Sequence, residues 1–494
     1  MSLRVYNTLS RQKEPFTTVE PGKVGMYLCG PTVYKPSHVG HMVGPVIFDT
    51  VKRYLTYLDY RVTFVVNITD VDDKLIVQSR EQKITMQELA ERVTADYRKQ
   101  LERLGVDSID HFPKATEHIG DIQRMITGLI DKGFAYAAGG DVYFDVAKDE
   151  DYGKLCNRDP EQLEAGARIE VSERKRNPGD FALWKGAKPG EPKWDSPWGA
   201  GRPGWHIECS AMSMKLLGQT LDIHGGGLDL QFPHHENELA QSESYSDKTF
   251  ARFWMHNGLI KVGAGKMSKS QGNEVVVKDV LERHKPETLR FFLLASHYRR
   301  PIDYSHERLE ETDRAMQGFY RFFERYERIT GERFSDLKAP ERRADFAPAD
   351  SRSLYLNEVA QNRGAFLECM DDDFNTGGAI GCLHELLSTL NRFADADRLE
   401  DANADESKLS SFRSGVVVLK ELSNILGVFR AEKMAGATGE SDKLLNDVMQ
   451  LVIDLRADAR KQKNFAMADQ IRQRLTQIGV TLEDRAGGSG WRRG

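Results

Sequence analysis

Apolar segments of two kinds alternate over the first 115 residues. Residues 24–34 (VGMYLCGPTVY) form an apolar run that ends in a Gly-Pro pair, as expected for a buried strand and a turn. Residues 38–58 carry apolar side chains at helical spacing, residues 61–67 (RVTFVVN) are rich in β-branched residues, and residues 86–104 are again helical in pattern. Strands that are apolar on both faces, alternating with helices, predict a doubly wound, Rossmann-type parallel sheet.

This pattern is interrupted between residues 116 and 200, where Gly, Pro and Trp accumulate. Strand-like runs return at residues 220–224 and 254–262. We therefore expect an α/β fold whose catalytic domain is split into two halves, residues 1–115 and 201–300, by an insertion at residues 116–200.

After about residue 300 the periodicity becomes helical. Polar stretches separate helical patterns at residues 353–370, 378–395, 408–429 and 443–463, and a short mixed segment closes the chain. These patterns predict a helical bundle within residues 301–430 and a small mixed α/β domain at residues 431–494.

The composition is that of an ordinary globular protein, with 40% hydrophobic and 29% charged residues in a chain of 494. No secretory leader pattern and no apolar run of about 18 residues is present, so we expect no membrane partner. Five scattered cysteines argue against a disulfide framework and for a cytoplasmic location. The net charge of −6 argues against a uniformly basic nucleic-acid binder, although the last 39 residues carry nine Lys/Arg against four Asp/Glu.

Two cysteines, a histidine and a glutamate could hold one metal ion. His234 and Glu238 are four residues apart, so a helix that begins at Pro233 would place them on one face. Cys29 follows the first predicted strand, and Cys209 could complete a tetrahedral set of S, N and O donors suited to zinc. The spacing matches no local zinc motif. Two buried structural cysteines beside a polar helix start are therefore the alternative.

Two short motifs are suited to phosphate binding. His38 and His41 flank Gly40 at the start of the first predicted helix, where a helix N-terminus and a glycine favour the close approach of an anion. Two lysines in residues 266–270 (KMSKS) lie among glycines, as in a loop that closes on pyrophosphate. Taken singly, each motif has an ordinary explanation, namely helix-capping histidines and a solvated basic surface.

Together, these motifs on a split parallel sheet resemble the class I aminoacyl-tRNA synthetases. The rest of the chain is similar to the cysteinyl-tRNA synthetase family in particular. The segments that carry this similarity are spread over nearly the whole chain, at residues 7–9, 26–34, 67–74, 204–212, 224–227, 232–238, 371–376 and 491–493. One departure is the run Met42-Val43-Gly44-Pro45 after the first motif, which leaves the packing near adenine open.

The resemblance implies a role for each candidate residue. The zinc ligands would be Cys29, Cys209, His234 and Glu238. The groups that stabilise the reacting phosphates of ATP would be His38, His41, Lys266 and Lys269. Gly30, Thr69 and Trp205 would wall the amino-acid pocket, and Gly227 and Asp229 would meet the adenosine ribose. Anticodon recognition in the small C-terminal domain would involve Arg460, Asp469, Asp484 and Trp491.

The activity implied is a two-step ligation by a monomer. L-Cysteine is activated with ATP and Mg²⁺ to cysteinyl-adenylate, and the cysteinyl group then passes to the 3′ end of tRNA(Cys). One zinc ion per chain would select the substrate thiolate over the hydroxyl of serine, because zinc prefers the softer sulfur ligand. Two alternatives are a ligase that transfers activated cysteine to a sugar amine and a catalytically silent tRNA-binding protein.

Overall fold

The computed structural model divides the chain into two compact units, Met1–Arg430 and Ala431–Gly494, and each is described by itself. The structure describes residues 2–157, 174–263, 265–266, 274–346, 353–401, 404–430, 440–485 and 488–493. Within this described part, no helix is both long and apolar enough to cross a lipid bilayer.

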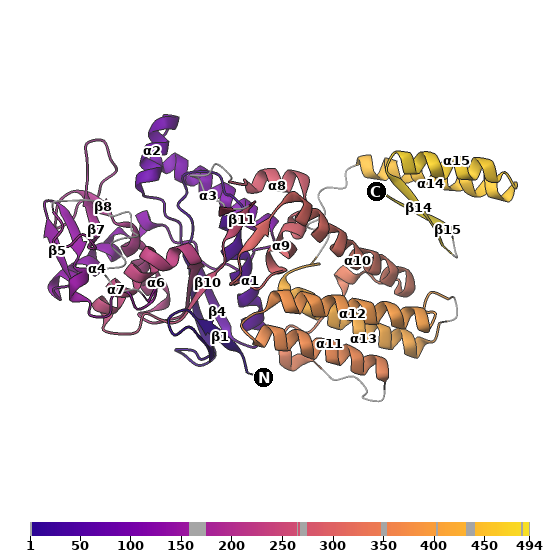
Figure 1. The fold of residues 1–494 in the computed structure, drawn as a ribbon, viewed down its shortest axis with the longest axis horizontal. Helices are drawn as coiled ribbons and strands as arrows, with labels where there is room; N and C mark the ends of the chain where they lie inside the picture. The colour runs from indigo at the N-terminus through magenta and orange to yellow at the C-terminus, as the bar shows by residue number, and fades with distance from the viewer. Residues whose placement is uncertain are drawn as a thin grey trace. The chain divides into compact units, whose positions relative to one another are not determined.

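A four-stranded parallel sheet forms the centre of the first unit (Figure 1). Its strand order is β10 (Ala251–Asn257), β9 (Leu221–Gly227), β3 (Lys23–Leu28), β4 (Arg61–Val66). Side chains of β3 alternate between two cores. Met26 and Leu28 pack in the same core as α1 (Gly40–Tyr57), whereas Tyr27 packs with residues of α6 (Trp205–Leu217). This alternation confirms the prediction of a sheet buried on both faces.

One predicted strand is wrong in detail, because residues 254–262 do not form a single strand. The chain bends at Gly258, where an added Cβ would lie 2.0 Å from the carbonyl oxygen of Arg300. It then enters a second sheet through β11 (Ile260–Val262), which pairs with β12 (Gly265–Lys266) and β13 (Ile302–Tyr304). A glycine is needed at this bend because two backbone segments come into contact there.

The region predicted as an insertion, residues 116–200, contributes three strands of an antiparallel sheet, and the fourth strand follows it directly. The strands are β5 (Ala135–Ala138), β6 (Asp141–Phe144), β7 (Phe181–Gly186) and β8 (Gly201–Pro203). This sheet shares a hydrophobic core with α4 (Ile119–Asp131), α6 and α7 (Glu236–Ser246). Trp184 is buried in this core, and the partly buried Trp194 and Trp198 pack against it, as expected for packing side chains.

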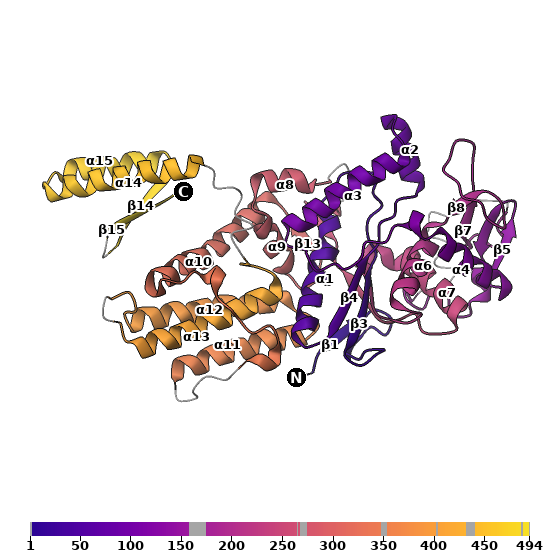
Figure 2. The same ribbon diagram turned by 180° about the vertical axis from the view of Figure 1, so that it is seen from behind.

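Helices make up the rest of the first unit, and Figure 2 shows the last four together beside α1. They are α2 (Asp73–Gln82), α3 (Met86–Arg103), α8 (Val277–Arg283), α9 (Pro286–Leu294), α10 (His306–Thr330), α11 (Leu354–Asp371), α12 (Thr376–Ala396) and α13 (Glu406–Leu426). The buried guanidinium of Arg290 joins the bundle to α1, because it pairs with Asp49 at 2.5 Å and donates to the carbonyl oxygen of Leu426 at 2.9 Å. An N-terminal hairpin consists of β1 (Arg4–Asn7) and β2 (Gln12–Pro15).

The second unit is a small mixed α/β unit. It consists of α14 (Glu440–Lys461), α15 (Phe465–Gln477) and an antiparallel pair, β14 (Val480–Arg485) and β15 (Gly488–Arg493). Buried side chains from both helices and from β14 form its core, and Trp491 of β15 packs against them. The mixed α/β end predicted from the sequence is therefore confirmed.

Candidate active site

The candidate site lies where the strand order of the central sheet reverses. Going outward from the β3–β9 junction, β4 lies beyond β3 and β10 lies beyond β9, so the two crossovers leave in opposite directions. The amide of Cys29, just past β3, donates to the carbonyl oxygen of Gly225 in β9 at 3.0 Å. A cavity of about 340 Å³ opens at this junction. Parallel α/β sheets bind ligands at such a switch point, beyond the carboxyl ends of the strands.

The four predicted metal ligands converge. One ligand atom from each of Cys29, Cys209, His234 and Glu238 lies within 4.8 Å of the others. Cys29 Sγ donates to Glu238 Oε1 at 3.2 Å, and His234 Nε2 lies 2.9 Å from the same oxygen. Cys209, His234 and Glu238 are buried, while Cys29 is partly exposed toward the cavity. Segments as much as 209 residues apart therefore build one cluster of two sulfurs, a nitrogen and an oxygen.

Local structure explains how His234 and Glu238 meet. The expected helix start at Pro233 is wrong, because α7 begins at Glu236 and is preceded by a π-helical turn, η4 (Gln231–His235). The i to i+4 contact survives because the turn leads directly into the helix. Cys209 lies in the second turn of α6, and α6 packs against α7.

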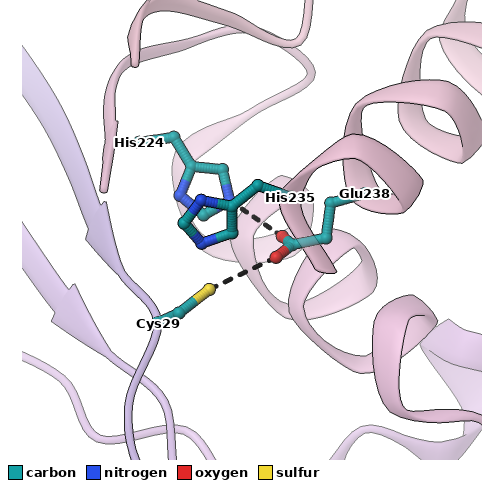
Figure 3. Close-up of side chains that lie close together, drawn as sticks. All are labelled: Cys29, His224, His235 and Glu238. Carbon is teal, nitrogen blue, oxygen red and sulfur yellow. Dashed lines mark hydrogen bonds and ion pairs between the residues drawn. The ribbon is translucent and has the colours of Figure 1, made fainter. Parts of the chain in front are cut away.

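A second layer of histidines surrounds Glu238 (Figure 3). His224 Nε2 lies 2.8 Å from Glu238 Oε2, so the two carboxylate oxygens have different partners. Cys29, His224, His235 and Glu238 form another set whose ligand atoms lie within 4.8 Å of one another. His235 Nδ1 in turn lies 2.8 Å from His256 Nε2. The sequence contained His224 in a glycine-rich motif but no spacing that assigned it to this layer.

The ionisable groups of the cluster strongly shift one another's pKa values. The hydrogen bond with Cys29 lowers the pKa of Cys209 to about 6, which favours a thiolate there. Burial raises the pKa of Glu238, but the charges of His224 and His234 outweigh this effect and hold the pKa well below its usual value. Burial also lowers the pKa of His234, yet the charge of Glu238 and the hydrogen bond with Cys209 raise it to about 10. Two anionic groups thus share a buried space of metal-ligand size.

The expected amino-acid pocket adjoins this cluster. The indole of Trp205 is 38% exposed and stacks on His234 with ring centroids 4.2 Å apart. The amide of Gly30 donates to Asn67 Oδ1 at 2.8 Å, and a Cβ at Gly30 would lie 1.8 Å from the carbonyl oxygen of Asn67. Gly30 and Trp205 both line the cavity. Thr69 is placed differently: it is buried behind this wall, where Asn67 Nδ2 donates to its hydroxyl at 3.3 Å.

Four of the expected nucleotide-binding residues, His38, His41, Gly227 and Asp229, also line this cavity. The rings of His38 and His41 stack with centroids 3.6 Å apart at the N-terminal end of α1. Burial lowers the pKa of His38, and burial followed by the charge of His38 lowers the pKa of His41 to about 3, so both imidazoles are neutral at pH 7. The unusual Met42–Pro45 run is buried in α1, where Gly44 lies against Leu28 and Asn257.

The remaining candidates belong to the second unit or are only partly described. The backbone of Lys266 belongs to β12 and pairs with Lys261, whereas Lys269 lies outside the described residues. In the second unit, Arg460 is exposed on α14, Asp469 is exposed on α15, and Trp491 pairs with Leu482 across the β14–β15 hairpin. Asp484 pairs with Ser489 in the same hairpin.

Glu236 has a structural role that sequence spacing did not reveal. Glu236 is buried, and its carboxylate accepts hydrogen bonds from the amides of Gly153, Leu155 and Cys156 at 2.7–3.2 Å. It therefore ties the start of α7, and with it the turn that carries His234, to the insertion. Only the fold brings the two segments together.

Solved structures with a similar fold define the class. The match to methionyl-tRNA synthetase of Mycobacterium tuberculosis bound by methionyl-adenylate covers 82% of this chain and 90% of that chain, with a TM-score of 0.61 and 15% identity. A LeuRS of Agrobacterium radiobacter in a ternary complex with tRNA covers 86% of each chain, with a TM-score of 0.59 and 11% identity. These likenesses show a shared fold, and the match of residues 15–314 to a class I tRNA synthetase catalytic domain shows that the fold is that of the class I aminoacyl-tRNA synthetases.

Sequence comparisons identify the family within this class. Residues 15–314 match the class I (C) tRNA synthetase catalytic domain, residues 365–430 the DALR domain, and residues 449–492 the cysteinyl-tRNA ligase anticodon binding domain. Cysteine–tRNA ligases of Geobacter sulfurreducens and Persephonella marina are 46% and 44% identical to this chain, over its full length and theirs. The chain belongs to the cysteine–tRNA ligase family, whose members use ATP to join cysteine to tRNA(Cys).

Proposed function

We propose that the buried cluster of Cys29, Cys209, His234 and Glu238 holds one zinc ion, which selects cysteine by its sulfur. The donor set supports this proposal, since two sulfurs, one imidazole nitrogen and one carboxylate oxygen are ligands that zinc accepts. When bound, zinc supplies a charge that stabilises a substrate thiolate and has little affinity for the hydroxyl of serine. The partly exposed Cys29 would face the incoming substrate from the side of the cavity.

The alternative donor set, which uses His224 and His235, fits less well. His224 already contacts Glu238 Oε2, whereas Oε1 faces Cys29 and His234. We therefore assign His224 to orienting the carboxylate, in the way that groups behind a metal site usually hold the ligands. The second sulfur, from Cys209, is the specific reason to prefer the first set, because a soft thiolate favours zinc over harder cations.

The remaining assignments concern the residues that would contact ATP and the amino acid. His38 and His41, both neutral, would donate hydrogen bonds to phosphate oxygens, and Lys266 and Lys269 would meet the charge that develops on the leaving pyrophosphate. Gly30 and Trp205 would bound the cysteine, with Thr69 supporting this wall, and Gly227 and Asp229 would meet the ribose. Mg²⁺ would accompany ATP. Charge stabilisation and positioning by these groups would carry the activation step.

Transfer to tRNA is favoured over the two rival functions. A ligase for a sugar amine would have no use for the region that matches the anticodon binding domain, over which Arg460, Asp469, Asp484 and Trp491 would contact the anticodon. A catalytically silent RNA-binding protein would not need a complete donor cluster beside a substrate cavity. A cytoplasmic location and a monomeric state remain predictions.

The zinc assignment can be tested with the Cys209→Ser variant. Metal content and cysteine-dependent ATP–pyrophosphate exchange are measured together, for wild type and variant, before and after chelation. We expect the variant to lose zinc and to lose cysteine activation, while equilibrium binding of ATP stays within about twofold. Full activation by a zinc-free Cys209→Ser protein would contradict the proposal. Charging of tRNA(Cys) transcripts with native and altered anticodons tests the transfer step.

A further inference from the structure

One side chain of the cavity has no role in the assignments above. Among the described residues that line the cavity, Lys74 is the only lysine or arginine. The other ionisable groups of the described lining include Asp229 and the two histidines, which are neutral at pH 7. A space that must accept ATP therefore contains a single fixed cation within the part of its wall that the structure describes.

The start of α2 directs Lys74 toward the cavity. Asp72 caps the helix, and its Oδ1 accepts a hydrogen bond from the Lys74 amide at 2.8 Å. Asp73 pairs with Lys185 of β7 at 3.2 Å and with Arg202 of β8. The carboxylate of Asp72 thus holds the backbone at the start of α2, and the carboxylate of Asp73 joins the same helix end to the antiparallel sheet. Lys74 is the next residue in the chain.

The position of Lys74 is electrostatically unfavourable for the helix alone. A cation in the first turn opposes the positive end of the helix dipole, which favours acidic residues there. Lys74 forms no ion pair with any residue that the structure describes, and its Nζ lies 5.7 Å from the ring centroid of Tyr34, another residue of the cavity wall. An ordinary surface lysine would also be exposed, but it would not line the substrate cavity.

The segment around Tyr34 pairs with residues that the structure describes after the lysine-rich motif at residues 266–270. Lys35, the neighbour of Tyr34, pairs with Glu274 at 3.7 Å, and His38 forms a β-bridge with Val276. Glu274 and Val276 follow the motif closely in the chain. Lys74 therefore lies beside Tyr34 in a cavity that His38 also lines, where phosphate groups are expected.

We propose that Lys74 binds a phosphate group of a substrate in this cavity and positions it for reaction. This inference rests on the proposed phosphate-binding role of the cavity and adds a fixed cation to it. The phosphate could belong to the polyphosphate of ATP and the released pyrophosphate, or to the phosphodiester at the 3′ end of tRNA(Cys). In both cases the ammonium forms a charge-assisted contact with a phosphate oxygen.

The test uses full-length Lys74→Met and Lys74→Arg, with Lys99→Met as a matched control. Lys99 is exposed on α3 and does not line the cavity. Three quantities are measured: KM for ATP and pyrophosphate in cysteine-dependent exchange, equilibrium binding of inorganic pyrophosphate, and the single-turnover rate of transfer from enzyme-bound cysteinyl-adenylate to tRNA(Cys). Zinc content and thermal unfolding serve as controls for folding.

Loss of one charged hydrogen bond corresponds to a change of about 10- to 100-fold. For Lys74→Met we expect a rise of this size in KM for ATP and pyrophosphate and weaker pyrophosphate binding, with an unchanged KM for cysteine. Lys74→Arg should stay within about threefold of wild type. A defect confined to the transfer step would instead identify the tRNA phosphodiester as the ligand.

Two results would overturn the proposal. One is a Lys74→Met protein that matches Lys99→Met in all three measurements. The other is a Lys74→Arg protein as impaired as Lys74→Met, because that pattern indicates a packing defect and not a missing charge. Failure of the zinc proposal is distinguishable, since it concerns metal content and the KM for cysteine, which the Lys74 variants are expected to leave unchanged.

Discussion

The proposed metal cluster and the proposed phosphate side of the cavity adjoin the same edge of one sheet, but they are built in opposite ways. In the cluster, Glu238 is fully buried and contacts Cys29, His224 and His234. In the cavity, five glycines are among the lining residues, and Lys74 is exposed without an ion-pair partner among the described residues. One region is cross-linked and closed, and the other is open.

This contrast follows from what each region must distinguish. Cysteine and serine differ by one atom, and a pocket that discriminates by size alone distinguishes two such substrates only weakly. A rigid set of buried ligands can instead respond to the chemistry of the sulfur. The phosphate side must admit ATP, release pyrophosphate and admit an RNA end, so it needs space and exposed charge. Variants in the two regions should therefore affect different substrates.

The largest effect is expected for Glu238→Gln. Removing this charge leaves His224 and His234 without their buried carboxylate, and breaking a buried ionic network is strongly destabilising. We expect cysteine activation to fall more than about 100-fold, since even groups behind a metal ligand usually contribute 10- to 100-fold. ATP binding should stay within about twofold. Asp247→Asn, which changes an exposed carboxylate just past α7, is the control.

A smaller effect is expected for His224→Asn. This change removes the partner of Glu238 Oε2 but leaves all four proposed ligands in place. Zinc affinity, measured by competition with a chelator, should fall about 10- to 100-fold. If the affinity is unchanged, the carboxylate does not need its second contact, and the cluster is less cross-linked than the contrast requires.

Gly30→Ala tests whether the open wall is also rigid. The added Cβ would lie 1.8 Å from the carbonyl oxygen of Asn67, so the backbone must shift. We expect a stability loss of about 1–3 kcal/mol in urea unfolding together with a higher KM for cysteine. Gly364→Ala is the matched control, because an added Cβ in this turn of α11 meets nothing within 4 Å. This control should raise stability by about 0.5–1 kcal/mol. Equal behaviour of the two variants would contradict a rigid wall.

The smallest effect concerns pH. The pKa of His41 is about 3 in the fold and about 6.5 in an unfolded chain, so the unfolded state binds more protons between these values. Stability is therefore fully present above pH 6.5 and falls as the pH drops toward 3. Between pH 6 and 5, wild type should lose on the order of 1 kcal/mol more than His41→Asn. His111→Asn, at an exposed site, should follow wild type.

Some features of the fold could be predicted from the sequence because they depend on residues that are close together in the chain. The runs at residues 24–34 and 61–67 correspond to β3 and β4, and the periodicity of residues 38–58 corresponds to α1. The contact between His234 and Glu238 was also predictable, since i and i+4 lie on one helical face. The break at Gly258 could not be predicted in this way, because it depends on the close approach of the backbone at Arg300, 42 residues away in the chain.

The sequence by itself determined the alternation of strands and helices and the family resemblance, and through that resemblance it predicted the four residues that the structure brings together as a possible metal site. Local periodicity and characteristic motifs encode these features directly. Only the tertiary structure decided that His224 lies behind Glu238, that Glu236 ties α7 to the insertion, and that Lys74 lines the cavity. Each of these contacts joins segments whose distance in space is set by sheet order and helix packing, which no single stretch of sequence specifies.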